Sequence, residues 1–383
     1  MAGWTDDGVP PELEDAPALL ETKLGKLCAM IDAAKYITVF TGAGISTSSG
    51  IPDYRGTTGL QMTRKPLVAL GLSEQKELDY IMPTYAHAAV AALARSGVVK
   101  LVATSNHDGL HNKAGTPDEV IADIFGNVYT EKCDKASPHC KTLFHRKVIV
   151  PTLGRVCDNA ACRGTLRKTG TRMGGMTPPE PLARADEQAR KSDLAIVLGS
   201  SLLVSPFCQL PFLAKKTVVV TLQETPYDSQ AALKINTRCD AVMRRIMAHL
   251  SMTVPPLDYT QPFSIHWQQR MDGPSNTWQI RISGDPARPS EPPRCVHSVM
   301  ARVRPLSGSG DDATKVTKEI DMDDRTGEFI GTVTVPAAHE IALTIEFNSA
   351  LDPSSALSTT RHISPHTSSA GSEVLEFVKH VPY

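Results

Sequence analysis

Short apolar runs that alternate with helix-like segments constrain the fold of this chain more than any other feature. The first helix-like segment carries an amphipathic stripe of Leu20, Leu24, Leu27, Ile31 and Ala34. The β-rich run YITVFTGAGIS follows at 36–46, and further buried-strand candidates lie at 98–106, 194–201 and 217–222, with helix-like segments at 84–95 and 180–191. Because this alternation builds parallel sheets with a helix layer on each face, the sequence predicts an α/β, Rossmann-like domain over residues 20–250.

Two regions break the alternation. Residues 127–178 hold four cysteines and little periodicity, which predicts a small module inserted into the α/β domain. Beyond residue 250, short alternating runs such as TWQIRISG and EIALTIEF are separated by Gly, Pro, Asp and Ser, which predicts a C-terminal antiparallel β-sandwich over 251–350. Segments 1–19 and 351–383 are rich in proline or in serine and threonine, and we expect both to be flexible.

The near-zero net charge of the chain argues against functions that need a strongly charged protein. Lys and Arg total 40 against 41 for Asp and Glu, so no overall charge supports direct binding of nucleic acid. The acidic, proline-rich start differs from a signal or transit peptide, and no apolar run approaches the roughly 18–20 residues that span a bilayer. We therefore expect a soluble intracellular protein without a membrane partner.

Four of the eight cysteines form two local pairs, Cys133 with Cys140 and Cys157 with Cys162. Two loops that each present two thiolates can close a tetrahedral Cys₄ zinc site without an open coordination position, which is typical of structural zinc. His139 or His145 could replace one thiolate, and free buried cysteines are the plain alternative. The other four cysteines fit ordinary core positions.

An incomplete dinucleotide motif follows the first predicted strand. Gly42-Ala43-Gly44 closes the strand, but Thr47 stands where a third glycine is expected, so the run also fits a tight turn. The loop GIPDYRG (50–56) then places an acid, an aromatic ring and a guanidinium between glycines, namely Asp53, Tyr54 and Arg55. Such a set suits a ligand with phosphates, a ribose and a ring, although a surface ion pair is the alternative.

Polar residues also close the other predicted strands. In TSNHDGLH (104–111), Asn106 and Asp108 could bond a carboxamide, and an Asx turn is the bland alternative. LGSS (198–201) and TLQ (221–223) place small and polar side chains at the same edge of the sheet, where α/β proteins bind ligands.

The order of these motifs resembles that of the sirtuins, the NAD-dependent protein-lysine deacylases of the Sir2 family. The resemblance covers about residues 20–250 and rests on TGAGIS, GIPDYRG, SNHDGLH, FGN, the cysteine pairs, VLGSSL and TLQETPYDSQAALKI. The spelling of the last motif and of CDAVMRRIMAHL is most similar to the class IV branch, which includes the human type 6 and type 7 nuclear enzymes.

The resemblance implies one structural Zn²⁺ on the four cysteines and an NAD site at the carboxyl edge of the sheet. Asn106 and Asp108 would hold the nicotinamide. The remaining cofactor-binding residues implied are Gly42, Ala43, Gly44, Thr47, Asp53, Tyr54, Arg55, Ser105, Gly199, Ser200, Ser201, Thr221, Leu222, Gln223 and Cys239.

The same resemblance implies a deacetylase-type reaction with a missing base. In sirtuins the acyl-lysine oxygen attacks the nicotinamide ribose and expels nicotinamide, and a histidine then takes a proton from a ribose hydroxyl as the acyl group moves to ADP-ribose. That histidine opens a His-Gly-Asn motif, which reads Phe125-Gly126-Asn127 here. Since general-base catalysis contributes about 10²–10⁴-fold, we expect impaired turnover.

Three further residues and one three-residue segment depart from the family pattern: Gln61, Ser105, Thr221 and Met173-Gly174-Gly175. These departures leave three hypotheses open: an impaired deacylase, an inactive NAD- or ADP-ribose-binding adaptor, and a mono-ADP-ribosyltransferase or NAD hydrolase. His107 is a conceivable substitute base, although it should face nicotinamide. The expected partner is an acylated lysine of a protein such as a histone, and the resemblance implies a nuclear location, with the cytoplasm as the alternative.

Overall fold

The computed structural model describes residues 11–53, 81–135, 140, 143–146, 154–159, 161–171, 175–269 and 277–283, together with six strands between residues 296 and 381. Among these residues, none of the helices is both long and apolar enough to cross a membrane.

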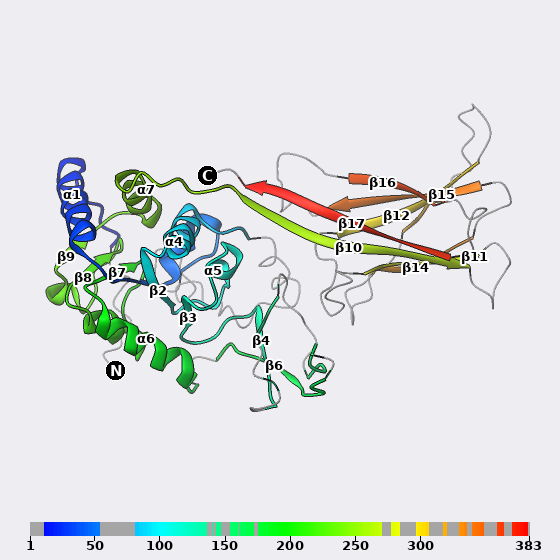
Figure 1. Cartoon of the computed structure of the whole chain (residues 1–383). Coiled ribbons are helices and arrows are strands. Elements are labelled where there is room, and N and C mark those ends of the chain that lie inside the picture. Colours follow the sequence, from blue (N-terminus) through cyan, green and yellow to red (C-terminus); the bar gives the residue numbers. More distant parts are fainter. Residues whose placement is uncertain are drawn as a thin grey trace.

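A six-stranded parallel sheet forms the centre of the N-terminal part (Figure 1), in the order β3-β2-β1-β7-β8-β9. All five strand pairs run parallel, and the order is that of doubly wound dinucleotide-binding folds. The predicted α/β, Rossmann-like fold is therefore confirmed. Its strands are β1 (Ile37–Thr41), β2 (Val99–Thr104), β3 (Ile121–Asp123), β7 (Leu194–Leu198), β8 (Thr217–Val220) and β9 (Leu233–Ile235).

Helices cover both faces of this sheet. Helices α1, α4 and α7 pack on one face, where Leu27, Val90 and Ile246 join the apolar residues of the strands, and α6 with η4 packs on the other around Phe40 and Phe207. The predicted stripe of the first helix is inward-facing, since Leu24, Leu27 and Ile31 are buried. The helices are α1 (Pro17–Ala33), η1 (Ala43–Ile45), η2 (Thr47–Ser49), α4 (Tyr85–Arg95), α5 (Leu110–Lys113), α6 (Pro179–Lys191), η4 (Phe207–Leu213), η5 (Asp228–Gln230) and α7 (Cys239–His249).

A small three-stranded antiparallel sheet follows the third parallel strand, in the order β5-β4-β6. It carries the cysteine region predicted as an inserted module. Its strands are β4 (Thr130–Cys133), β5 (Leu143–His145) and β6 (Leu166–Lys168).

The C-terminal part is a sandwich of two four-stranded antiparallel sheets, β14-β11-β10-β17 and β13-β12-β15-β16. Alternate residues of β11 face inward, so that Trp278, Ile280 and Ile282 are buried while Gln279 and Arg281 are exposed. The predicted antiparallel sandwich is confirmed. Its strands are β10 (Leu257–Gln269), β11 (Thr277–Ser283), β12 (Val296–Pro305), β13 (Thr317–Glu319), β14 (Phe329–Thr334), β15 (His339–Phe347), β16 (Ser358–Ile363) and β17 (Ala370–Val381).

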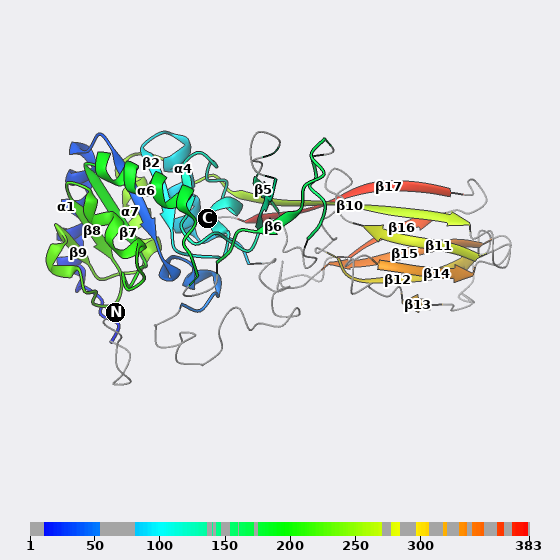
Figure 2. The same cartoon turned by 90° about the horizontal axis from the view of Figure 1, so that it is seen from below.

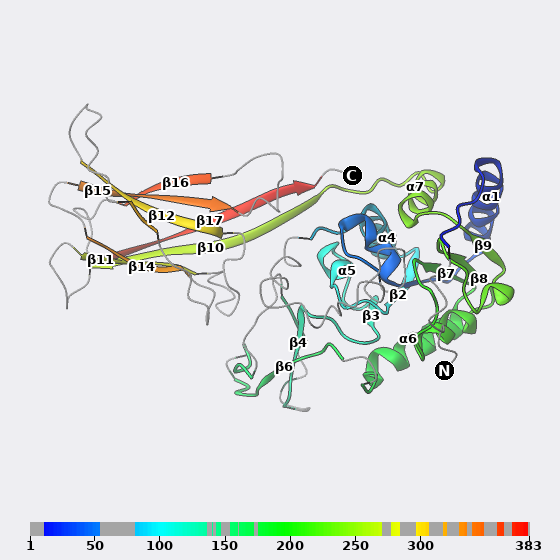
Figure 3. The same ribbon diagram turned by 180° about the vertical axis from the view of Figure 1, so that it is seen from behind.

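The prediction of a flexible tail over 351–383 is wrong for most of its length, because β16 and β17 are integral strands. β17 pairs with β10 from Leu257–Val381 to Gln268–Ala370, and Figures 1 and 3 show this long ribbon joining the sandwich to the region of α7. Threonine is favoured in strands, so a high content of serine and threonine did not by itself indicate a flexible segment. Figure 2 shows the sandwich extending away from the parallel sheet.

The segment predicted to be flexible at the N-terminus is also held where it is described. The Leu13 amide donates to the Leu222 carbonyl over 2.6 Å, and the Asp15 carboxylate accepts from Lys23 and from the Asn236 amide. Residues 11–16 therefore lie across the loops that follow β8 and β9.

Candidate active site

The loops after β1 and β7 meet at the carboxyl edge of the sheet. The chain winds from β1 outward to β3 and then returns to the other side of β1 with β7, so this edge is the topological switch point at which such folds bind ligands. The Gly42 amide donates to the Leu198 carbonyl over 3.0 Å, and the Gly44 amide donates to the Gly199 carbonyl over 2.8 Å.

Glycine is required where these two loops cross. A Cβ atom on Gly42 would lie 2.7 Å from the Ser200 Cα, and one on Gly199 would lie 2.4 Å from the Ile45 nitrogen. Gly199 also has a φ of +64°, which disfavours other residues. The glycines thus let two backbones touch, and they leave the polar groups around them in a fixed arrangement.

A hydrogen-bonded triangle of Ser46, Asn106 and Asp108 lies at this crossing. The Ser46 hydroxyl donates to Asp108 Oδ2 over 2.7 Å, and Asn106 Nδ2 lies 3.2 Å from the same oxygen and 3.2 Å from the Gly42 carbonyl. The other Asp108 oxygen accepts from the Leu110 amide over 3.0 Å. The Asn-x-Asp segment is therefore more than a local turn, because it joins the loops after β1 and β2.

Phe125 follows β3 and packs partly against the apolar cluster under α6. Its ring also contacts the imidazole of His107, with the ring centroids 6.3 Å apart and the planes inclined by 39°. Burial lowers the pKa of His107, against a hydrogen bond with the Gly126 backbone and the nearby Asp108 carboxylate. Two aromatic rings therefore stand side by side between the loops after β2 and β3.

The turn that presents Phe125 is tightly fixed. Gly126 has a φ of +67°, and a Cβ there would lie 2.1 Å from the Thr169 carbonyl oxygen. The buried Asn127 side chain donates to Asp123 Oδ2 over 2.7 Å and to Asn112 Oδ1 over 3.2 Å, and accepts from the Tyr129 amide over 2.9 Å. Burial raises the pKa of Asp123 to about 7, in spite of the hydrogen bond from Asn127.

Several other predicted cofactor residues lie on the same edge. The hydroxyls of Thr47 and Ser105 donate to backbone carbonyls of the β1 end and its loop, at Gly44 and Thr41. Ser200 accepts from the Leu202 amide, and Ala43 begins η1. Thr221, Leu222 and Gln223 follow β8, and Cys239 begins α7 and is buried.

Some predicted residues cannot be placed at the site. Asp53 and Ser201 are among the described residues, and Ser201 lies in the loop after β7. The residues outside the described part of the chain are Tyr54, Arg55, Gln61, His139, Met173 and Gly174. The acidic and aromatic loop therefore stays a prediction.

Ser46 and Asp240 were not singled out from the sequence. Asp240 accepts from the Ser48 hydroxyl and from the Ala86 amide, each over 2.8 Å, and so ties the start of α7 to η2 and α4. Ser46 could have been found because it belongs to the quoted TGAGIS motif, whereas Asp240 carried no signal apart from its place at a helix N-terminus.

The four predicted cysteines converge on one point. The Sγ atoms of Cys133, Cys140, Cys157 and Cys162 all lie within 4.8 Å of one another, with Cys133–Cys162 at 3.5 Å and Cys140–Cys157 at 3.6 Å. A tetrahedral site with bonds of about 2.3 Å requires S···S separations of about 3.8 Å. The donor set therefore fits Zn²⁺, and His145 instead pairs with Asp118.

An ionic network ties together β4, which carries Cys133, the end of β5 and the loop that carries Cys157. Glu131, in β4, accepts from Arg146 Nε over 2.9 Å and from Arg155. Arg146 also donates to Asp158 over 2.5 Å. Glu131 and Arg146 are buried, and Arg155 and Asp158 flank Cys157.

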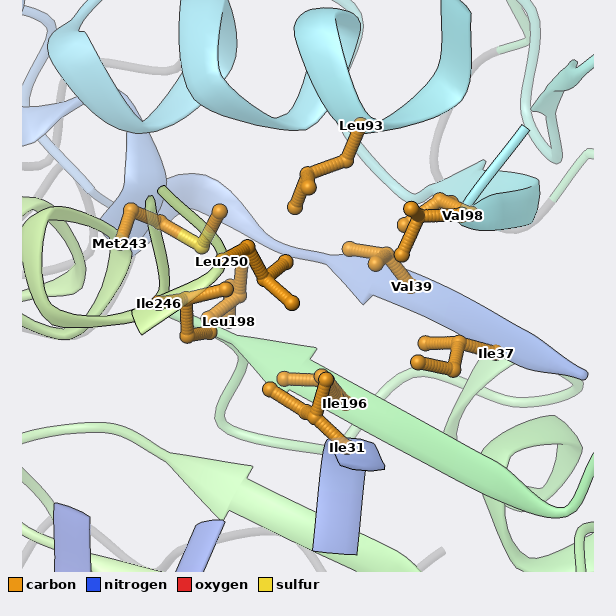
Figure 4. A pocket seen from close by; sticks show the side chains of 11 residues that line it. Ile31, Ile37, Val39, Leu93, Val98, Ile196, Leu198, Met243, Ile246 and Leu250 are labelled. Atoms are coloured by element: carbon orange, nitrogen blue, oxygen red, sulfur yellow. The ribbon is translucent and has the colours of Figure 1, made fainter. Parts of the chain in front are cut away.

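An apolar cavity exists elsewhere, within the helical core of the N-terminal part. Figure 4 shows it between α4, α7 and the sheet, lined by residues such as Val39, Leu93 and Ile246. None of its lining residues belongs to the carboxyl-edge loops, so it is a packing defect rather than the candidate site.

Comparisons with known proteins decide the family. Residues 61–206 match the Sir2 family profile. The NAD-dependent protein deacetylase Sirt6 of Drosophila melanogaster is 31% identical over 277 residues, which cover 67% of this chain and 84% of that protein. The chain belongs to the Sir2 family. The predicted relationship to the sirtuins is thereby confirmed.

Two further similarities were found. The NAD-dependent protein deacetylase SRT1 of Oryza sativa subsp. indica is 34% identical over 285 residues, which cover 71% of this chain but only 57% of that protein. A solved structure described as Sir2-p53 peptide-NAD+ is 27% identical, with a TM-score of 0.46 over 60% of this chain and 100% of that chain. The chain thus spans about three fifths of the length of this plant relative.

Proposed function

We propose that this sirtuin is an NAD-dependent protein-lysine deacylase whose acyl-transfer step is impaired. The reaction consumes acyl-lysine, NAD and water and yields lysine, nicotinamide and O-acyl-ADP-ribose. The triangle of Ser46, Asn106 and Asp108 carries the proposal, because it presents a carboxylate and an amide at the topological switch point of the parallel sheet. The chain that forms this sheet belongs to the Sir2 family.

Each part of the site has a task in this proposal. The backbone around Gly42, Gly44 and Gly199 binds the phosphate side of NAD, because glycine-rich loops at the carboxyl edge of doubly wound sheets bind dinucleotide phosphates. Asn106 and Asp108 hold the carboxamide of nicotinamide. The residues after β8, together with Cys239, surround the adenosine half.

Phe125 is the reason that we propose impaired turnover. A phenyl ring accepts no proton, and here it packs on the apolar cluster under α6 and against His107. NAD binding does not require the base, so binding and nicotinamide release should be less affected than formation of O-acyl-ADP-ribose. This same residue favours the second candidate function, a non-catalytic NAD- or ADP-ribose-binding adaptor, and a hydrolase or mono-ADP-ribosyltransferase is the third.

One experiment separates these candidates. The protein is incubated with NAD and an acyl-lysine peptide, and nicotinamide and O-acyl-ADP-ribose are measured beside an Asp108→Asn variant. A deacylase forms both products and loses both in the variant. NAD binding without either product indicates the adaptor, and nicotinamide with free or protein-bound ADP-ribose indicates the third class.

The remaining assignments are also proposals. We propose one structural Zn²⁺ on the four cysteines, a catalytic part over 20–250 with the cysteine module inserted at about 127–178, and a separate sandwich that extends to residue 381. An acylated lysine of a nuclear protein, such as a histone, is the proposed partner. This location rests on the resemblance to the nuclear branch, and imaging of the tagged protein tests it.

A further inference from the structure

We propose that His107 is the proton acceptor for the acyl-transfer step, in place of the residue at position 125. This inference rests on the proposed deacylase function. It addresses the question that Phe125 raises, which is where the proton of the ribose hydroxyl goes.

Position supports His107 first. The residue lies between Asn106 and Asp108, the two residues proposed to hold nicotinamide, and its ring contacts Phe125 with the centroids 6.3 Å apart. The imidazole of His107 therefore contacts the side chain at position 125, which is where sirtuins carry their catalytic histidine. It reaches the site from the loop after β2 instead of the loop after β3.

Orientation supports it second. The His107 backbone carbonyl accepts from the Val128 amide over 3.1 Å, and its imidazole makes a hydrogen bond with the Gly126 backbone. A ring nitrogen engaged with a backbone group fixes the tautomer and the plane of the ring, and in this proposal the second nitrogen takes the proton. Gly126 is itself locked against Thr169, so the partner of the imidazole is rigid.

Protonation state supports it third. Burial lowers the pKa of His107, so the imidazole is neutral near pH 7, as a base must be. The charged group that acts on the imidazole is Asp108 on its own loop, and Asp108 also lies near the Asp123 carboxylate at the end of β3.

The other imidazoles in the described N-terminal part are engaged elsewhere. His87 and His111 are fully buried against each other, and His111 Nε2 lies 2.8 Å from the Thr41 hydroxyl. His145 lies 3.2 Å from Asp118, and His249 lies 2.8 Å from Asp32. The Asp123 carboxylate is a competing acceptor, but Asn127 already occupies one of its oxygens.

The step balances without a further reagent. The ribose O–H bond breaks, and its proton goes to the free ring nitrogen of His107. The ribose oxygen forms a bond to the acyl carbon, and the electron pair of the carbon–nitrogen double bond moves to the lysine nitrogen. The imidazolium returns the proton as the lysine amine leaves, and the water that the overall reaction consumes then adds to the acyl carbon and loses its proton to the imidazole, which gives O-acyl-ADP-ribose.

The test compares four proteins: the unaltered chain, His107→Gln, Phe125→His and the double variant. For each, O-acyl-ADP-ribose formed per nicotinamide released is measured, together with the Kd for NAD. We expect His107→Gln to lower this ratio at least 30-fold in the unaltered background but less than threefold when Phe125→His supplies a base. Added imidazole should restore part of the activity of His107→Ala.

Each other outcome overturns the inference. Equal losses in both backgrounds, or a Kd for NAD that rises in parallel, assign His107 a structural role. If Asp123→Asn abolishes the product and His107→Gln does not, the proton goes to the carboxylate. If the unaltered chain forms no O-acyl-ADP-ribose and the Phe125→His protein does, the deacylase proposal stands and His107 is not the base. If all four proteins neither release nicotinamide nor form product, the proposed function fails as well.

Discussion

At the scale of single residues, the turn at Gly126 should be the least tolerant position of the site. A Cβ there would lie 2.1 Å from the Thr169 carbonyl oxygen, and the φ of +67° disfavours side chains. We expect Gly126→Ala to lower the free energy of unfolding by about 3 kcal/mol, since strain and overlap add. Gly50 is the matched control, because its φ is +86° and nothing lies within 4 Å of its Cβ position. Urea unfolding of both variants tests this, and equal losses would contradict it.

The buried pair His87 and His111 should make stability depend on pH. Burial lowers the pKa of each to about 3, so the native protein stays unprotonated where the unfolded chain binds protons. Stability is therefore complete above about pH 6.5 and falls as the pH drops towards 3, by about 1.4 kcal/mol per pH unit for each histidine. Asp123 acts in the opposite sense, because its raised pKa costs stability as the pH rises towards 7.

Comparison with a variant isolates the histidine contribution, since Asp123 is common to both proteins. Between pH 7.5 and 5, we expect His111→Asn to lose about 2 kcal/mol less unfolding free energy than the unaltered chain. Parallel pH curves for the two proteins would show that the pair does not titrate on unfolding.

At the scale of elements, the ionic network should stabilise the cysteine module. Arg146→Met removes one of the two arginines that pair with the buried Glu131 and leaves Arg155, so we expect a loss of about 1–3 kcal/mol, below the 3–5 kcal/mol that an unpaired buried charge costs. We expect faster loss of bound Zn²⁺ to a chelator, because the ion pairs of Arg146 that join β4, the end of β5 and the Cys157 loop are removed. Arg190→Met is the control, since Arg190 makes an exposed pair with Asp186 on α6. Identical zinc release from both variants would contradict this role.

Elements with strong periodicity were predictable from the sequence, and elements stabilised by distant partners were not. The stripe over 20–34 and the strands around Val39, Val102 and Ile196 follow from local pattern, because each buries a continuous apolar face. β17 did not, because it depends on backbone pairing with β10, which lies more than a hundred residues earlier. The ionic network of Glu131, Arg146 and Asp158 could not be predicted from the sequence either, since charged residues normally indicate a solvated surface.

At the scale of the whole molecule, the parallel sheet and the sandwich bury separate cores. Val90, Val102 and Ile246 belong to the first, while Phe263, Ile280 and Leu343 lie on the strands of the second. We expect two calorimetric unfolding transitions. Ile280→Ala should lower only one of them, with a loss of about 2–4 kcal/mol for a buried large-to-small change, and Ile246→Ala should lower only the other. A single transition that both variants shift equally would show one cooperative unit.

The candidate site shows the same limits of sequence-based inference. Motif order singled out Asn106 and Asp108, which are hydrogen-bonded to each other at one edge of the sheet, and the four cysteines, which form one cluster. It gave Phe125 as a missing base but did not show that His107 contacts it, because residues eighteen positions apart in the chain meet only through the pairing of β2 with β3.

The most direct measurement of the central claim is the rate of O-acyl-ADP-ribose formation by the unaltered chain and by Phe125→His, with NAD binding measured for both. General-base catalysis is worth about 10²–10⁴-fold. Since His107 already supplies part of it in our account, we predict a gain of at least about tenfold at an unchanged Kd for NAD. A variant that binds NAD equally well but shows no gain would contradict the account that Phe125 limits this enzyme.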